Sequence, residues 1–544
     1  MTASTSGTPS TSGSAPEQRA RRQSDAIVIG AGTNGLVAAI ALAKAGRKVV
    51  VLERAAEVGG MRAMNEIAPG FRAPLGADSG WLPPSVARGI GLAPPAVVTP
   101  EVSVTAPLPD GGFLSLASDR RRAVEAIRRH SPGDADRWIA FTQRVRALAG
   151  FLEALYQVPA PGIDASLSPR EMLPLIGVGR KFRALGKHDM TELLRTMPMP
   201  AKDWLDDALD NETLKAAIGA GAVRDIRQGP RSGGTAFVLL HYLTGAGEGA
   251  VRARPWWQGG PDALTNALVE LARRHNVTIR TNAEVARIVV RDDAVAGVAL
   301  ANGDEITAPV VVSTADPART LLGLVEPIWL DPELLLAARQ IKFRGSTAIV
   351  QYALDRLPEI AGLAEPEQAL SSVVSLTSSL DTLERAYDAA KYGEVSEEPH
   401  IEITVPTLRW PALAPAGKHV LTATVRCAPY ALRGGATWDA AGAAALGDRV
   451  TAAIGRAVPR FADSIRHRAL LTPRDIETRF ALTEGAFTHG EITLDQILFM
   501  RPLAGWGRYA MPVMGLYLGG SGAHPGPGVL GGAGWLAARR VLQD

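Results

Sequence analysis

Two glycine-rich segments, one near each end of the chain, constrain the fold more than any other feature of the sequence. The first contains Gly30, Gly32 and Gly35 in the spacing G-x-G-x-x-G, directly after the apolar run 25–29. The second covers residues 516–529 and reads LYLGGSGAHPGPGV. Most of the 544 residues lie between these segments. A site built from both would therefore require the chain to return to the place where it began.

The first segment predicts a site for a dinucleotide. The β-branched run before it is typical of a buried parallel strand, and residues 36–44 are rich in good helix formers. In such a strand–turn–helix unit, Gly30 permits the tight turn and Gly32 lets the backbone approach a pyrophosphate. Gly35 allows the helix to pack closely on the strand. The helix N-terminus, near Thr33, presents free N–H groups to the phosphates.

An acidic residue stands where a ribose would be held. A second apolar strand, predicted at 49–52, ends at Glu53, which follows Gly35 by 18 residues. A carboxylate at this place accepts hydrogen bonds from ribose hydroxyls and disfavours a 2′-phosphate. Strand, glycines, helix, strand and acid occur in the expected order, so a coincidental glycine turn is the weaker interpretation.

The next glycines favour FAD over NAD. Gly59, Gly60 and Arg62 follow Glu53 closely, where a simple NAD dehydrogenase would continue its sheet. Here the chain resembles the flavoprotein superfamily of amine oxidases and phytoene desaturases, in which a Gly-Gly-Arg wraps the FAD. The resemblance implies that these three residues contact the cofactor. Met61 departs from the pattern, because it separates Gly60 from Arg62.

The C-terminal segment makes the resemblance more specific. Residues 520–526, Gly-Ser-Gly-Ala-His-Pro-Gly, are similar to the phytoene dehydrogenase-like flavoproteins that include the pyridine nucleotide-disulfide oxidoreductase domain-containing protein 2 group. The resemblance covers most of residues 25–544. It implies that a helix starting near Val529 points its N-terminus at the flavin. It also implies that Ser521, Gly522 and Gly528 line the cofactor, with Ser521 where many relatives have an aspartate.

The same resemblance implies non-covalent FAD and removal of hydrogen from an apolar, isoprenoid or polyene-like substrate, with hydride transfer to flavin N5. The cofactor carries the difficult chemistry, while the protein orients the substrate and excludes water. Two alternatives remain open. One is a flavin-dependent amine oxidase, which shares the fold, and the other is a flavin-binding scaffold that acts through protein partners.

A base near the flavin would assist the reaction, and two histidines are candidates. His524 lies on the C-terminal glycine-rich turn, and His489 lies in the preceding segment Gly485–Glu491. Histidine has a pKa suited to accepting a proton near neutral pH. For each histidine the alternative is a structural hydrogen bond within the loop.

Two residues of the central region are assigned through the resemblance alone. In the superfamily, the valine of an N-x-E-V element contacts adenine through its backbone, and Val285 closes such an element here. A Pro-x-Gly-Gly segment lies near the flavin in the phytoene desaturase-like group, and Trp257 falls within the matching stretch. Trp257 would then shape the substrate side, the alternative being structural packing.

These segments predict an α/β protein in which two domains interleave. A Rossmann-type FAD-binding domain is expected from residues 25–105, 255–320 and 485–544. An α+β substrate domain is expected from residues 106–254 and 321–484. Residues 1–24 are rich in Ser, Thr, Gly and Pro, which predicts a disordered tail.

Composition excludes several functions. Cys427 is the only cysteine, so the chain has no disulfide, no redox dithiol and no cysteine-based metal site. No histidine-rich metal spacing stands out either, and a net charge of +3 argues against a nucleic-acid surface. No apolar run is long enough to span a bilayer, so we expect a cytoplasmic protein. A peripheral membrane contact would suit a lipid-like substrate, and the oligomeric state stays open.

Overall fold

The two ends of the chain meet in one parallel sheet. The computed structural model describes residues 23–75, 80–160, 169–247, 251–360, 362–363 and 365–544. Its five-stranded sheet joins, in spatial order, β19 (Leu516–Leu518), β13 (Val311–Ser313), β1 (Ala26–Ile29), β2 (Val49–Leu52) and β9 (Thr278–Arg280). All four pairings are parallel. The last strand of the chain thus lies two positions from the first, which confirms the predicted Rossmann-type domain.

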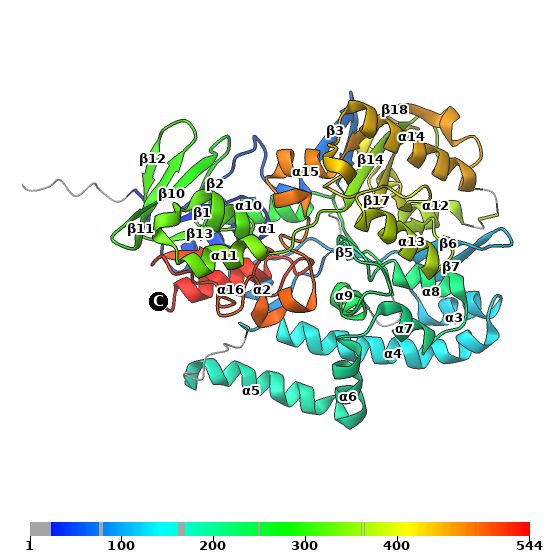
Figure 1. The fold of residues 1–544 in the computed structure, drawn as a ribbon, viewed down its shortest axis with the longest axis horizontal. Coiled ribbons are helices and arrows are strands. Elements are labelled where there is room, and N and C mark those ends of the chain that lie inside the picture. The colour runs from blue at the N-terminus through cyan, green and yellow to red at the C-terminus, as the bar shows by residue number, and fades with distance from the viewer. Residues whose placement is uncertain (1–22, 76–79, 161–168, 248–250, 361, 364) are drawn as a thin grey trace, which may run out of the picture.

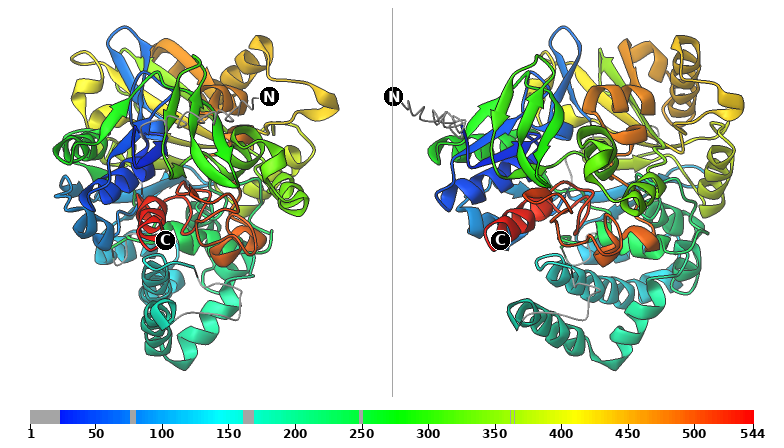
Figure 2. Two further views of the ribbon diagram at one scale, coloured as in Figure 1. Left: turned by 90° about the vertical axis from the view of Figure 1, so that its left-hand side faces the viewer. Right: turned by 60° about the vertical axis from the view of Figure 1, so that its left-hand side comes forward.

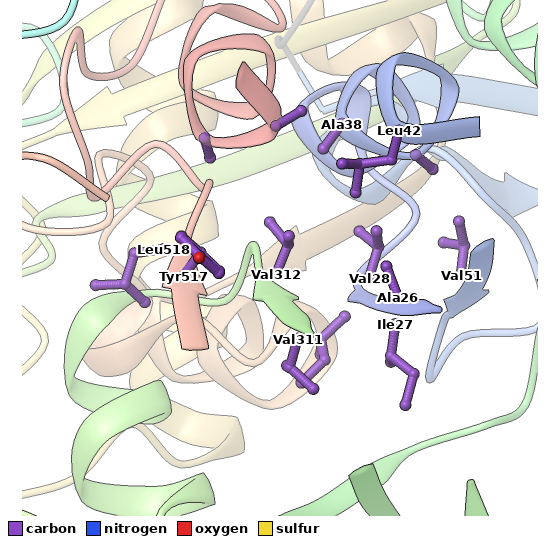
Figure 3. Close-up of a cluster of buried hydrophobic side chains, with 14 of the residues drawn as sticks. Ala26, Ile27, Val28, Ala38, Leu42, Val51, Val311, Val312, Tyr517 and Leu518 are labelled. Atoms are coloured by element: carbon purple, nitrogen blue, oxygen red, sulfur yellow. The ribbon is translucent and has the colours of Figure 1, made fainter. Parts of the chain in front are cut away.

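Helices and a second small sheet bury this sheet. The helices α1 (Thr33–Lys44), α10 (Ala263–Arg274) and α16 (Gly532–Val541) pack together. Figure 3 shows Val28 and Val312 pointing toward Ala38 and Leu42 of α1, while Ile27 and Val311 point to the opposite face. This alternation follows from the two-residue period of a strand. The antiparallel sheet β10 (Val285–Arg291), β11 (Ala294–Leu300) and β12 (Glu305–Thr307) shares the same hydrophobic core.

A seven-stranded mixed sheet forms the second domain (Figure 1). Its spatial order is β18 (Ile465–Leu471), β14 (Thr347–Leu354), β17 (His419–Arg426), β16 (His400–Thr404), β15 (Val373–Ser375), β6 (Val102–Pro107) and β7 (Phe113–Ala117). The chain enters this domain from the first sheet, leaves it for β9–β13, and then returns. The two domains are therefore interleaved in sequence, as predicted for this α/β protein.

Helices complete the second domain. Helix α4 (Pro132–Leu155) buries an apolar face that includes Trp138, and it packs on α9 (Thr235–Tyr242), which is buried almost throughout. Helices α5 (Pro169–Ala184) and α6 (Gly186–Thr196) lie beyond α4, where Figure 2 shows them at the lower edge of the molecule. Within the described ranges, we find no helix long and apolar enough to cross a membrane.

Further helices and short strands pack within or against these two domains. They are α2 (Pro84–Ile90), β5 (Val97–Val98), β8 (Trp256–Trp257), α3 (Arg120–Arg128), α7 (Ala201–Asp206), α8 (Glu212–Gly219), α11 (Pro332–Gln340), α12 (Pro366–Ser371), α13 (Leu380–Lys391), α14 (Ala440–Ala457) and α15 (Pro473–Phe480).

Several predicted boundaries differ from the structure. The division at residue 105 falls inside β6, which belongs to the seven-stranded sheet. Helix α11 was expected in the substrate domain, yet its apolar face packs into the core of the Rossmann-type domain. An apolar run predicts an element but not the sheet or core that the element joins.

The strands β12 and β13 are separate, because Pro309 between them has no N–H to donate to a ladder. One predicted element also begins at another residue. The last helix begins at Gly532 and not near Val529. Gly531 before it adopts a left-handed conformation with φ 70°.

Candidate cofactor and substrate site

One cavity of about 640 Å³ extends from the first glycine turn to the sheet of the second domain. Its volume falls within the range of roughly 300–1,000 Å³ that is usual for small-molecule and cofactor sites. Most of the residues that the sequence singled out line it. They are Gly30, Gly32, Thr33, Glu53, Gly59, Gly60, Arg62, Val285, His489, Ser521, Gly528 and Val529.

The three glycines of the first turn have different roles. Gly30 has φ 95°, a conformation that side chains disfavour. A Cβ on Gly35 would overlap the carbonyl oxygen of Gly30, so only glycine allows α1 to approach the turn. At Gly32, by contrast, no atom of the described chain lies within 4 Å of where a Cβ would stand. Gly32 therefore opens onto the cavity, as a backbone that approaches a pyrophosphate must.

Glu53 lies at the end of β2, beside this turn, and its side chain is buried. Its Oε2 accepts a hydrogen bond from the Ala31 N–H at 2.9 Å, and its Oε1 accepts one from the Ala55 N–H at 2.9 Å. A carboxylate has about four acceptor positions, so capacity remains for ribose hydroxyls. The Ala283 N–H also donates to the backbone carbonyl of Glu53 at 2.8 Å, which brings the segment ending at Val285 to the same end of the cavity.

The glycine pair Gly59 and Gly60 packs over the first glycine turn. The Gly59 N–H donates to the Ala31 carbonyl at 3.0 Å, and a Cβ on Gly60 would lie 3.4 Å from the Cα of Gly32. Both Gly59 and Gly60 have positive φ. Arg62 follows in a single 3-10 turn, with a buried side chain that lines the cavity. These features fit a dinucleotide. The backbone is open at Gly32, a carboxylate stands at Glu53, and Arg62 provides a buried cation.

Asn34 joins the two ends of the chain directly, although sequence reasoning did not select it. Its Nδ2 donates to the Ser521 hydroxyl at 3.4 Å, and its Oδ1 accepts from the Gly534 N–H at 3.3 Å. A Cβ on Gly534 would overlap the Asn34 carbonyl, so α16 packs tightly on the start of α1. Asn34 occupies a variable position of the glycine motif, and no local pattern marks it.

Gly522 does not line the cavity, contrary to prediction. A Cβ there would collide with the Pro317 ring, so the absence of a side chain serves loop packing. The neighbouring Ser521 does line the cavity. Successive residues of an irregular turn face different directions, and the sequence alone does not indicate which.

The prediction that His524 is a catalytic base is not supported by its position. Its side chain is fully buried and is absent from the cavity wall. The Nε2 atom lies 3.2 Å from the Val158 carbonyl, so the ring braces this turn against the helical layer. Burial lowers the pKa of His524 to about 4. The alternative interpretation, a structural hydrogen bond, describes this residue.

His489, in contrast, lines the cavity. It has φ 54°, which is uncommon for a residue other than glycine and is found disproportionately at functional sites. Its Nδ1 is buried and has no hydrogen-bond partner within the described ranges. Burial lowers the pKa of His489 to about 4, partly opposed by Asp316. The imidazole is therefore neutral near pH 7 and can accept a proton.

Trp257 is part of the core and not of the substrate wall. It lies in β8, which pairs with β5, and its side chain is only 6% exposed. It packs into the hydrophobic core of the Rossmann-type domain. Its carbonyl accepts a hydrogen bond from the Trp410 Nε1 at 3.2 Å. The proposed substrate-side role was wrong, and packing is the correct interpretation.

Sequence reasoning missed a group of charged residues at the part of the cavity that the second domain lines. Arg252 and Arg254 both form ion pairs with Glu402, the latter at 2.8 Å. Arg426 forms ion pairs with Asp225 and, at 3.4 Å, with Glu402. These five side chains come from widely separated segments, so no local motif reveals them.

Together, the sheet order and the cavity are those of a two-domain protein with a Rossmann-type dinucleotide site. Two family models match the chain: the NAD(P)-binding Rossmann-like domain over residues 28–85 and the flavin containing amine oxidoreductase over residues 219–542. The chain belongs to the flavin-containing amine oxidoreductase family and is a flavin-dependent oxidoreductase.

Individual relatives agree with this class. The chain is 33% identical to pyridine nucleotide-disulfide oxidoreductase domain-containing protein 2 of Rattus norvegicus, over 96% of this chain and 93% of the rat protein. It is 25% identical to a phytoene desaturase (neurosporene-forming) of Rhodobacter capsulatus, over 95% and 93%. A solved putrescine oxidase variant superimposes with a TM-score of 0.57 at 16% identity, covering 96% and 98%. The predicted family resemblance is confirmed.

Proposed function

We propose that this protein binds FAD non-covalently and removes hydrogen from a C–C bond of a substrate with an apolar body. The observation that carries the proposal is the continuous cavity that connects the dinucleotide turn to the wall of the second domain. The relative named as a phytoene desaturase supports this kind of reaction. The only cysteine, Cys427, is buried outside the cavity wall and offers no thiol for covalent attachment.

The residues of the cavity suit such a substrate. Met64, Leu75, Phe480 and Phe487 line it and provide apolar contacts that exclude water. When bound, FAD supplies the acceptor for a hydride. Formation of a double bond also releases a proton from the neighbouring carbon, so a base beside the substrate is required. His489 is the histidine of the described chain that lines this cavity, and its ring nitrogen would accept that proton.

The same cavity is poorly suited to an amine. Substrate amines are cationic near neutral pH, and the wall of the second domain presents the guanidinium groups of Arg254 and Arg426. Like charges at close range disfavour binding. We therefore prefer dehydrogenation of a carbon skeleton over amine oxidation.

An anaerobic titration of the flavin-loaded protein tests this function. We expect detergent-dispersed isoprenoids or polyenes to bleach the absorption of the oxidised flavin, and primary and secondary amines to leave it unchanged. Bleaching by amines alone would establish an amine oxidase. If dithionite bleaches the flavin but neither set of compounds does, the alternative of a flavin-binding scaffold gains support.

Replacing His489 should separate the proton-accepting role from a structural one. We expect His489→Gln to lower the rate of flavin reduction by the active compound by about 10²–10⁴-fold, the usual contribution of general base catalysis. Because the pKa of His489 is lowered to about 4, its neutral form is present throughout pH 6–8. The wild-type rate should therefore be independent of this group over that range and should fall only as pH approaches about 4.

His524→Gln is the control, because His524 is a histidine of the neighbouring turn that is fully buried and does not line the cavity. It should reduce stability while leaving the rate per bound flavin within about twofold of wild type. Equal losses of rate in both variants would exclude a specific role for His489.

A further inference from the structure

We propose that the end of the cavity at Arg254 and Arg426 binds an anionic group, so that the substrate joins an apolar body to a carboxylate or phosphate. The proposal rests on the proposed function, because it assigns a head group to the compound that is oxidised. It concerns the cluster of charged residues at that end, which we call the arginine subsite. Its members are Asp225, Arg252, Arg254, Glu402 and Arg426.

The arginine subsite carries an excess of positive charge. Three guanidinium groups share two carboxylates, and Glu402 alone contacts all three arginines. Arg224 adds a further cation, which lies 3.3 Å from Asp225 and stacks over the ring of Tyr242 at 4.7 Å. The five members of the arginine subsite have an excess of positive charge even when Arg224 is not counted.

The charged side chains of the arginine subsite are buried. The side chains of Arg254 and Arg426 are 9% and 4% exposed, and that of Glu402 is 2% exposed. Burial lowers the pKa of Arg254 to about 10, with Glu402 opposing and the neighbouring arginines adding to the shift. An uncompensated buried charge is strongly unfavourable, so a counter-ion in the cavity would stabilise the arrangement. His400, the titratable neighbour of Glu402, adds no further positive charge, since burial lowers its pKa to about 4 and leaves it neutral.

A donor is also available for that anion. The Nε of Arg426 is buried and has no hydrogen-bond partner within the described part of the chain. Guanidinium groups bind carboxylates and phosphates through paired, charge-assisted hydrogen bonds. Tyr242 and Thr424 line the same end of the cavity. An oxyanion placed there would gain donors from two elements of the second domain.

The arginine subsite and the cofactor end belong to one space. Arg254 and Arg426 line the same cavity as Gly528 and Val529 of the C-terminal turn. A molecule held by its anionic end at the arginines would therefore extend its apolar part toward the cofactor. The arginines would fix which carbon of that part lies at the reacting position.

A series of C20 isoprenoids that differ only in the head group tests the proposal on the oxidised, FAD-loaded protein. Binding would be measured by the perturbation of the flavin absorption spectrum. We expect the carboxylate or the diphosphate to bind about tenfold to 100-fold more tightly than the alcohol, and the primary amine to bind more weakly still. The tighter of the two anions identifies the head group. Equal affinities for alcohol and anions would refute the proposal.

Substitutions at two arginines that pair with Glu402 distinguish a ligand contact from a structural one. Arg252 and Arg254 both pair with Glu402, but only Arg254 lines the main cavity. We expect Arg254→Gln to weaken binding of the anion about tenfold or more without changing that of the alcohol, and Arg254→Lys to restore part of the loss. Arg252→Gln removes the same positive charge but no group of the cavity wall, so it should weaken anion binding clearly less than Arg254→Gln does. Similar losses in both glutamine variants would indicate a purely structural cluster.

The outcomes also separate this inference from the proposed function. If the alcohol reduces the flavin but the anions bind no better, the function stands and the anion subsite is wrong. If the anions bind through Arg254 yet reduce no flavin, the subsite stands and the proposed function is wrong. If Arg254→Gln shifts the flavin midpoint potential but not anion affinity, these arginines serve the cofactor and the inference fails.

Discussion

Gly32→Val is expected to yield a folded protein that contains no flavin. Gly32 has an ordinary φ of −74°, so valine does not strain the backbone there. No described atom lies within 4 Å of the new Cβ, which means that the side chain projects into the cavity and not into the core. It would occupy the space through which the backbone approaches the pyrophosphate. Bound flavin per mole of purified protein should fall by about 100-fold or more, while the circular dichroism spectrum is unchanged.

Two further glycine substitutions sharpen this result. Gly455 in α14 also has no described atom within 4 Å of a Cβ, so Gly455→Val makes the same change outside the cavity and should retain full flavin content. Gly35→Val should instead disrupt folding, because its Cβ overlaps the Gly30 carbonyl. Normal flavin content in Gly32→Val would show that the dinucleotide does not bind at this turn.

The cofactor end of the site could be predicted because its determinants are local. Gly30, Gly35 and Glu53 are set by the geometry of one strand–turn–helix–strand unit, in which spacing along the sequence determines position in space. The return of the C-terminal glycine-rich segment to the first turn was also predicted, since a site built from both ends requires it. The structure shows this return in the pairing of β19, β13 and β1.

The substrate end could not be predicted in the same way. Arg254 and Arg426 approach each other only because a loop before β8 meets the end of β17 in the tertiary fold. The two histidines illustrate a second limit. Both lie in irregular loops near the cofactor, but His489 faces the cavity and His524 faces Val158. Sequence indicates the loop to which a residue belongs, whereas packing decides which way its side chain points.

Arg501 organises the loops that carry these histidines, and sequence reasoning gave it no role. Arg501 is 3% exposed, and among the described residues its guanidinium donates only to backbone carbonyls. Both Nε and Nη2 donate to the Ser521 carbonyl, at 3.0 and 2.9 Å. Nη1 and Nη2 reach the carbonyls of Glu491 and Gly490, each at 3.1 Å, and further bonds go to Gln496 and Thr488. One side chain thereby ties the loop of His489 to the C-terminal turn.

Arg501→Lys should therefore be severely destabilising although it keeps the charge. An ammonium has three donors on one atom and cannot reach carbonyls arranged around a planar fork. Each buried carbonyl left unsatisfied costs about 1–3 kcal/mol, so the loss of several should remove about 3–6 kcal/mol from the free energy of unfolding. Urea unfolding and flavin content would measure this. Arg466→Lys, at an exposed arginine 3.5 Å from Asp355, is the control and should change stability by less than about 0.5 kcal/mol. An equally small effect in both variants would mean that the Arg501 hydrogen bonds do not hold these loops together.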